Sequence, residues 1–391
     1  MSDVVEHWRT SDRFAAINEY RLKPVAHTLL PRTPLYTSRR QADVYSLRSD
    51  NGLAFMLKKF HNVRGLNPTY LAAVRRLLPQ EQGFVAGTQR AMLTAQTLAS
   101  GNGWYYSAAL ARWLDGTLLM PRVEGCDWAS AADDVRAGQL DLPRSVRVAL
   151  ARSLAHLVER LEACQCSHRD LSGPNVFVNR GDKTVELIDF DSLCHPSLVM
   201  PAVTTCGTAG YVAPFVWNTG NRADATWREF ADRFALTVLV AEILAVDVGA
   251  PWSGDGGLFG QAELAVRQGP GIHWARSRLR AEFPAALALL DTALASTSFA
   301  DCPTPGQWQA TLTDVRTPDR PATANLRWYG LRKFVQGVLF EDVPMMPAPA
   351  PPRLSEIPVP TVRLPESLVR VVSLPPDPWA GGNGADRQRR T

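Results

Sequence analysis

One segment near the middle of the 391-residue chain constrains the fold more than any other, because polar and apolar residues follow one another there in short blocks. The polar block His168-Arg-Asp170 leads into two short apolar runs, Asn175–Val178 and Val185–Phe190. Between the two runs lies Arg180-Gly-Asp182, which is typical of a turn. The segment therefore predicts a β-hairpin that follows directly on a polar loop and ends near the carboxylate of Asp189.

A coarse pattern of elements surrounds this hairpin. Residues 33–60 predict short strands, including a hairpin through the turn Ser49-Asp-Asn-Gly52, and residues 68–99 predict two helices. Strand-like segments follow at 104–113 and 116–123. The apolar spacing predicts one buried helix over 143–164, and residues 227–315 are expected to be helical with long loops. A small strand-rich part thus precedes a larger helical part.

The end of the chain has a different composition. Residues 317–342 predict an additional helix, whereas eleven of the 29 prolines lie between Pro344 and Pro378. A segment so rich in proline favours extended polyproline II structure over helix. We expect residues 343–391 to be a flexible tail, and a docking segment for a partner is the alternative.

Composition and charge exclude several classes of protein. The net charge of +4, from 42 basic and 38 acidic residues, is too small to predict a nucleic-acid partner. The longest apolar run, Phe234–Val246, is about 13 residues, shorter than the roughly 20 needed to cross a bilayer. The N-terminus lacks the apolar core of a signal peptide, and the six cysteines are scattered. We therefore expect reduced thiols, no membrane partner and a cytoplasmic location.

The central segment resembles the catalytic loop and metal-binding motif of protein kinases. In that family His-Arg-Asp is followed by four residues and Asn, and Asp-Phe-Gly comes after a β-hairpin. Here His168-Arg-Asp170 precedes Asn175 at the same spacing, and Asp189-Phe-Asp191-Ser192 stands in place of Asp-Phe-Gly. The combination resembles a divergent group of bacterial Ser/Thr kinases that carry Asp-x-Asp-Ser at this position.

The resemblance implies a fold and a division of the chain. We expect an α+β, bilobal protein-kinase-like fold with a small β-rich N-lobe, a larger helical C-lobe and a proline-rich C-terminal tail. The implied boundaries are an N-terminal extension at 1–29, the N-lobe at 30–123 and the C-lobe at 124–316. The additional helix at 317–342 and the tail at 343–391 follow.

The same resemblance implies ATP and Mg²⁺, or Mn²⁺, and gives roles to individual residues. Asp170 would orient the acceptor hydroxyl and accept its proton, and Asn175 would hold one metal ion. Asp189 would bridge the metal ions to the phosphates, which suits the preference of Mg²⁺ for oxygen ligands. Asp191 would either add a carboxylate near the metal or bond to the backbone of the loop.

Two more matches lie downstream in the expected order. Cys206-Gly-Thr-Ala-Gly-Tyr-Val-Ala-Pro214 resembles the end of a kinase activation segment, which implies a contact between Thr208 and Asp170. Asp232-Arg-Phe-Ala-Leu236 resembles the start of the long C-lobe helix, which implies that Asp232 binds amides of the catalytic loop. Kinases of small molecules lack the first of these segments. A protein substrate is therefore favoured over a small-molecule or lipid substrate.

The N-terminal part resembles the kinase N-lobe less closely. Phe55-Met-Leu-Lys58 is similar to the strand whose lysine holds the α- and β-phosphates, and alternation along a strand lets only one of Lys58 and Lys59 face the site. We expect this to be Lys58. Met120 would lie behind the adenine, and the backbone of residues 121–123, including Arg122 and Val123, would form the hinge that binds it.

The family pattern is broken where its glycine-rich phosphate loop would lie. Residues 37–45 contain no glycine, and Arg39 or Arg40 is the expected electrostatic substitute. Glu81 is the one glutamate between Lys59 and Glu124 that could pair with the lysine. Glycine after Asp189-Phe is replaced by Asp191, and glutamate after Ala-Pro by Phe215.

Two functions remain open at this point. The first is a Ser/Thr protein kinase that transfers the γ-phosphate of ATP to a protein hydroxyl through Asp170, Asn175, Asp189 and Lys58. The second is a pseudokinase, a scaffold or regulatory module that binds nucleotide without efficient transfer. The resemblance to the bacterial group also implies a PPM-type phosphatase and a von Willebrand A protein as partners.

Overall fold

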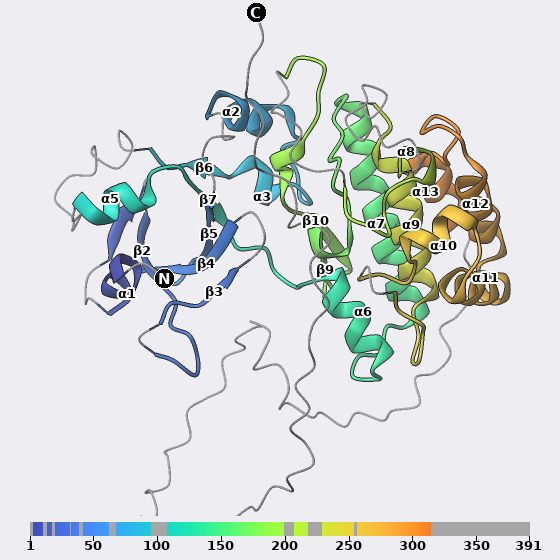
Figure 1. Ribbon diagram of the computed structural model, residues 1–391, viewed down its shortest axis with the longest axis horizontal. Coiled ribbons are helices and arrows are strands. Elements are labelled where there is room, and N and C mark those ends of the chain that lie inside the picture. Colours follow the sequence, from blue (N-terminus) through green and yellow to red (C-terminus); the bar gives the residue numbers. More distant parts are fainter. Residues whose placement is uncertain are drawn as a thin grey trace, which may run out of the picture. The chain divides into compact units, whose positions relative to one another are not determined.

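The fold is known from a computed structural model that describes residues 3–10, 14–17, 20–31, 33–38, 42–61, 68–94, 108–198, 207–217, 229–253 and 256–313. All of these residues belong to the first of two units, Met1–Leu339 and Phe340–Thr391. The predicted helix at 317–342, the tail at 343–391, and Arg39 and Arg40 lie outside the described residues. The described residues form a mixed α+β fold in which an antiparallel sheet precedes a mainly helical part (Figure 1).

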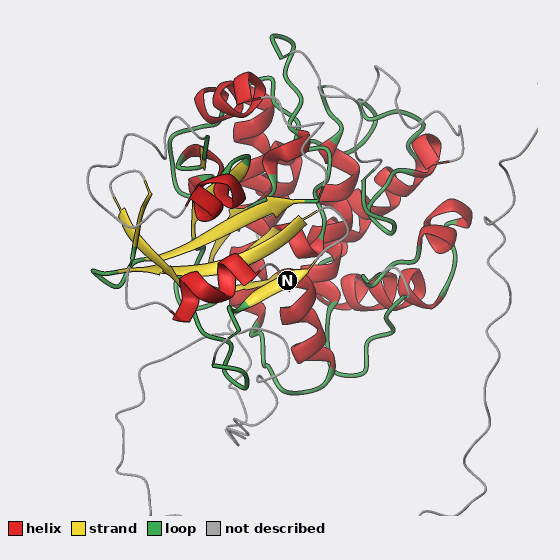
Figure 2. Ribbon diagram, turned by 60° about the vertical axis from the view of Figure 1, so that its left-hand side comes forward, coloured by secondary structure: helices red, strands yellow, loops and turns green. Residues whose placement is uncertain are grey.

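Seven strands build the larger sheet. They are β1 (Ala15–Ile17), β2 (Tyr20–Pro24), β3 (Tyr36–Ser38), β4 (Ala42–Ser49), β5 (Ala54–Phe60), β6 (Ala91–Met92) and β7 (Thr117–Pro121). Their order is β1-β2-β4-β5-β7-β6, and β3 pairs with β4. Strands β4 and β5 form the hairpin predicted through residues 49–52, with Val44 opposite Lys58. Figure 2 shows these strands, in yellow, as one group.

Residues 1–29, which were expected to form an extension, are in part a component of this sheet. Strand β2 pairs with β4, and Ala15, Ile17 and Leu22 are buried beside helix α1 (Asp3–Thr10). Strand β1 is only three residues long, which is too short for its apolar residues to predict a strand. The predicted boundary at residue 30 therefore divides a continuous sheet.

Two other predicted elements differ from the structure. The strand expected at 104–113 is replaced, over its described residues, by helix α5 (Ala108–Leu114). Its buried Leu110 and Leu114 are four residues apart, which places them on one face of a helix. The two helices expected over 68–99 are α2 (Pro68–Leu77) and the single turn α3 (Val85–Thr88), after which the chain enters β6.

The second part of the described chain is mainly helical. Its helices are α6 (Trp128–Arg136), α7 (Arg144–Ala163), α8 (Pro214–Trp217), α9 (Asp232–Ala245), α10 (Gln261–Val266), α11 (Pro270–Glu282), α12 (Pro284–Ala295) and α13 (Pro305–Thr313). Helix α7 confirms the helix predicted at 143–164, and it packs against α9, every residue of which is buried. None of the helices in the described ranges is both long and apolar enough to cross a membrane.

A small sheet packs against α6 and α7 and lies next to the polar loop His168-Arg-Asp170. It consists of β8 (Cys126–Asp127), β9 (Val176–Asn179) and β10 (Thr184–Leu187), in the order β10-β9-β8. Strands β9 and β10 confirm the hairpin predicted in the central segment. Short 3₁₀ turns precede and follow this hairpin, at Gly173–Asn175 and Phe190–Ser192. The hairpin thus brings Asn175, just before β9, close to Asp189, just after β10.

Candidate functional site

The buried carboxylate of Asp232 holds the loop that carries Asp170 in place. Asp232 is the first residue of α9, and its two oxygens accept hydrogen bonds from the backbone N–H groups of His168 (2.6 Å) and Arg169 (2.9 Å). Arg169 has a φ of 68°, a left-handed conformation that costs energy in a residue other than glycine. The expected contact between Asp232 and the loop is confirmed, and it supports this strained backbone.

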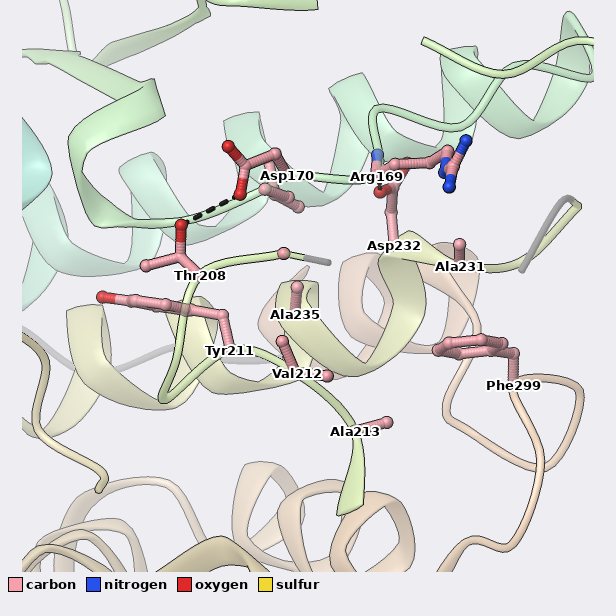
Figure 3. A pocket seen from close by; sticks show the side chains of 12 residues that line it. Arg169, Asp170, Thr208, Tyr211, Val212, Ala213, Ala231, Asp232, Ala235 and Phe299 are labelled. Carbon is pink, nitrogen blue, oxygen red and sulfur yellow. Dashed lines mark hydrogen bonds between the residues drawn. The ribbon is translucent and has the colours of Figure 1, made fainter. Parts of the chain in front are cut away.

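Asp170 lies between two hydrogen-bond donors. The hydroxyl of Thr208 donates to its Oδ1 at 2.9 Å, and Asn175 Nδ2 donates to its Oδ2 at 3.3 Å and to its backbone oxygen at 2.8 Å. Figure 3 shows Asp170 and Thr208 in direct contact with one another among the residues that line a small pocket, which Phe299 also borders. Burial raises the pKa of Asp170 above its ordinary value, against the nearby His168 and the Thr208 hydroxyl, which lower it.

Asp189 stands at the point where β10 turns away from the sheet. Its backbone is left-handed, with a φ of 64° and a ψ of 55°. The next residue, Phe190, is buried and lies 5.0 Å from the His168 ring, measured between centroids. His168 Nε2–H donates to the carbonyl of Ile188 at 2.7 Å. The contacts of Phe190 and His168 therefore fix the position of Asp189 between the β9–β10 hairpin and the loop that carries Asp170.

Gly87 leaves room for this packing. A Cβ atom at position 87 would lie 2.3 Å from the Leu78 side chain and 2.6 Å from the Phe190 ring. Real Cβ atoms do not approach that closely, so any larger residue at 87 would displace Phe190. The segment that contains α3 is also tied to the hairpin, because Glu186 accepts hydrogen bonds from the backbone N–H of Gly83 (2.7 Å) and of Ala86 (3.2 Å).

Strand β5 sends its two adjacent lysines in different directions. Lys58 Nζ lies 2.8 Å from Asp189 Oδ1 and 2.7 Å from Asp191 Oδ2. Lys59 Nζ instead donates to the backbone oxygen of Trp113 at 2.6 Å. Alternation along the strand thus brings Lys58 against the hairpin end, from a position 131 residues away in sequence.

The charges around Lys58 form a buried group. Burial lowers the pKa of Lys58, but Asp191 and Asp189 outweigh this effect and raise it. Burial would raise the pKa of Asp191, but Lys58 and Arg90 lower it to about 2. For Asp189, burial dominates over Lys58 and raises the pKa. Asp191 is therefore the carboxylate that these two cations keep ionised.

Arg90 is a member of this group that the sequence analysis missed. It lies between α3 and β6, its side chain is 3% exposed, and its Nη1 is 3.1 Å from Asp191 Oδ1. No local pattern marks such a residue, because its partner is 101 residues away. Asp191 itself faces these two cations, whereas the sequence analysis expected either a metal or the loop backbone.

Glu81 does not pair with Lys58. Its Oε1 lies 2.8 Å from Arg160 Nε on helix α7, and both side chains are more than a third exposed. Such surface pairs contribute little to stability. The lysine at the site is held by aspartates of the hairpin end and not by a glutamate between α2 and α3.

The residues predicted to form the hinge lie at the end of β7. Met120 is paired with Met56 across the sheet and is half-buried. The backbone N–H of Arg122 donates to Ala54 O at 3.0 Å, so this donor is engaged by the sheet. Val123 is half-buried and leads to Gly125. Met120 therefore belongs to β7 itself, whereas Arg122 and Val123 lie on the chain that connects the large sheet to β8.

The segment 207–217 is fastened to α9 and to the loop before α13. The Tyr211 hydroxyl donates to Glu242 Oε2 at 3.1 Å, and Trp128 Nε1–H donates to the same oxygen at 3.2 Å. Phe215, which stands where the kinase pattern has a glutamate, packs edge-on against Phe299 with ring centroids 5.0 Å apart. At position 215, where the sequence differs from the kinase pattern, the side chain therefore makes an aromatic contact.

We expect Glu242 to make stability depend on pH. Burial raises its pKa from 4.5 to about 7, against three hydrogen bonds that lower it. The folded state then binds the proton more tightly than the unfolded chain, so this group's contribution to stability falls as pH rises from 4.5 to about 7. At about 1.4 kcal/mol per pKa unit, the expected loss is about 3 kcal/mol.

Urea unfolding at about pH 5 and about pH 8 measures this effect, with Glu242→Gln as the matched variant. The variant lacks the titrating group, so its unfolding free energy should decrease less between the two pH values than that of the wild type. An identical pH dependence in both proteins would contradict the assignment.

The donor set at the hairpin end suits a hard cation. Asn175 uses its amide nitrogen within the loop, which leaves its Oδ1 as the atom able to ligate a metal, and Asn175 O accepts from Ile188 N at 3.1 Å beside Asp189. Amide and carboxylate oxygens are the ligands that Mg²⁺ prefers. Across the residues that the structure describes, no three His, Cys, Asp or Glu side chains gather as a metal site. Asn175 and Asp189 would thus supply two oxygen ligands to such a cation.

Comparison with known proteins leaves the site to be interpreted from its own geometry: no family model matches this sequence, and no curated protein matches it.

Proposed function

We propose that the protein is a kinase that transfers the γ-phosphate of ATP to a hydroxyl of a protein substrate. The observation that carries the proposal is the 2.8 Å contact between Lys58 of the sheet and Asp189 of the hairpin. This contact places the Lys58 ammonium, which could bind phosphate oxygens, next to the Asp189 carboxylate, which could bind a metal ion. The bilobal kinase-like fold implied by the motifs requires both groups near Asp170. Both the motifs and the geometry support the proposal.

Each residue has a defined task in this reaction. Lys58 would bind the α- and β-phosphates of ATP, and Asn175 and Asp189 would hold magnesium. Magnesium, when bound, would neutralise charge on the phosphate oxygens. Asp170, held by Thr208, would orient the acceptor hydroxyl and take its proton. The hinge of residues 121–123 would bind the adenine, and Phe299 would border the place of the acceptor segment.

A pseudokinase is the second candidate function, and one observation favours it. Lys58, Asp189, Asp191 and Arg90 pair with one another, so a nucleotide has to compete for Lys58 with two carboxylates. In that case the protein would act as a scaffold, and the PPM-type phosphatase and von Willebrand A protein implied by the resemblance would be its partners. Under the kinase proposal they would instead belong to a phosphorylation circuit.

Transfer from γ-labelled ATP, with Mg²⁺ or Mn²⁺, tests the proposal. We expect the wild type to label itself or a generic protein substrate, and Asp189→Asn to lose more than about a hundredfold, because a metal supplies several kcal/mol of charge stabilisation. The variant is isosteric, and its folding is checked by thermal unfolding. Nucleotide binding without any transfer by the wild type would reject the kinase in favour of the pseudokinase.

A further inference from the structure

Asp191 lies between two cations that come from different parts of the chain. Its Oδ2 lies 2.7 Å from Lys58 Nζ of β5, and its Oδ1 lies 3.1 Å from Arg90 Nη1, between α3 and β6. The side chains of Lys58, Asp191 and Arg90 are 11%, 17% and 3% exposed. Both carboxylate oxygens are therefore occupied by protein cations in a site nearly closed to solvent.

Burial of the Arg90 guanidinium costs free energy of hydration, and the ion pair with Asp191 offsets this cost. Taking a guanidinium out of water is unfavourable unless a partner compensates for the lost hydration. Within the described ranges, Nε and Nη2 of Arg90 are buried without a hydrogen-bond partner, so Asp191 is the carboxylate that receives its hydrogen bond. Among the described residues this buried guanidinium has one ion pair, with Asp191, so it is positioned to hold the Asp191 carboxylate in place.

The backbone around Asp191 is fixed as well. The hydroxyl of Tyr70, on α2, donates to Leu193 O at 2.6 Å and to Asp191 O at 3.4 Å. Tyr70 thus fixes the turn, while Arg90 fixes the direction of the carboxylate. Asp191 can then present a stationary oxygen to Lys58.

Lys58 needs such a partner once nucleotide binds. Of its two carboxylates, Asp189 is the one that a metal ion would draw away, whereas Asp191 has both oxygens engaged. Glu81, the glutamate expected beside the lysine, pairs with Arg160 instead. We propose, resting on the function proposed above, that Asp191 held by Arg90 positions Lys58 for the phosphates, and that neither residue is a metal ligand or a phosphate ligand.

Nucleotide affinity distinguishes this arrangement from a simple effect of charge. If the pair positions Lys58, Arg90→Met and Asp191→Asn should each raise the Kd for ATP about tenfold, and the double variant should be no weaker than the worse single variant. If only the local potential mattered, Asp191→Asn would bind ATP more tightly, and the double variant would return to the wild-type Kd. Either of these two results overturns the proposal.

Two further variants separate positioning from structural damage. In a Lys58→Met background, Arg90→Met should change the Kd no further, because there is no amine left to position. Arg90→Lys keeps a cation and should restore affinity to within about threefold of the wild type. A loss of affinity that persists without Lys58 would show that Arg90 acts on the nucleotide directly or on the fold. The double variant, which leaves no buried charge unpaired, provides a folded protein where a single variant does not fold.

The contact between Asp191 and Lys58 can also be tested without nucleotide. A negative result in this test is therefore distinct from a negative result for the kinase proposal. Acetylation of amines in the full chain, followed by peptide mass spectrometry, should modify Lys58 several-fold faster in Asp191→Asn than in the wild type. Lys59 is the internal control, since it bonds to Trp113 O instead. Acceleration of both lysines indicates general loosening, and an unchanged Lys58 rate overturns the proposal even if ATP binds.

Discussion

Replacing Asp232 by alanine is expected to lower the free energy of unfolding by about 3–5 kcal/mol, because the change removes a buried carboxylate whose partners stay buried. The backbone N–H groups of His168 and Arg169 would both lose their acceptor. The left-handed backbone of Arg169 would also lose its support. Urea unfolding measures the loss, with the fluorescence of the 11 tryptophans as the signal.

Asp232→Asn is the matched control for this prediction. Asparagine retains one acceptor oxygen in the same position, so it should satisfy one of the two amides and cost about half as much as alanine. A loss below about 1 kcal/mol for Asp232→Ala would mean that water or a shifted loop satisfies the amides. In that case the anchor would not be what fixes the loop.

Local patterns predicted the elements whose stability is decided locally. The hairpin of β9 and β10 follows from two apolar runs around Arg180-Gly-Asp182, and helix α7 follows from apolar residues at helical spacing. The alternation of side chains along β5 lets only one of Lys58 and Lys59 face the site, and the resemblance of Phe55-Met-Leu-Lys58 to the kinase strand favoured Lys58. In each case the period of the sequence determines which side chains can be buried together.

Local sequence patterns could not predict the contacts between segments that are far apart in the sequence. Arg90 meets Asp191 only because the fold brings the α3–β6 connection to the hairpin end, and neither residue stands in a recognisable motif with the other. Helix α5 was predicted as a strand because a short apolar run fits either period, and packing against α1 decides it. The β1–β2 hairpin was missed because Ala15–Ile17 is only three residues long, too short for a clear alternation.

Replacing Asp170 by asparagine is expected to reduce kcat of phosphate transfer by roughly 10²–10⁴-fold, which is the usual contribution of a positioned general base. The geometry gives the reason. Asp170 receives hydrogen bonds from Thr208 and Asn175, whereas Lys58 contacts Asp189 and Asp191. Asparagine keeps the shape and one acceptor for Thr208, but it cannot take the proton of the acceptor hydroxyl.

The effect should fall on the chemical step and not on binding. The Kd for ATP is expected to stay within about threefold of the wild type in Asp170→Asn, and Thr208→Ser, which keeps the hydroxyl, should retain most of kcat. Single-turnover transfer and equilibrium binding, measured on the same protein, separate the two quantities. Equal losses in kcat and in affinity would place Asp170 among the residues that hold nucleotide, and an unchanged kcat would remove it from the reaction, leaving Lys58 and Asp189 as parts of a binding site alone.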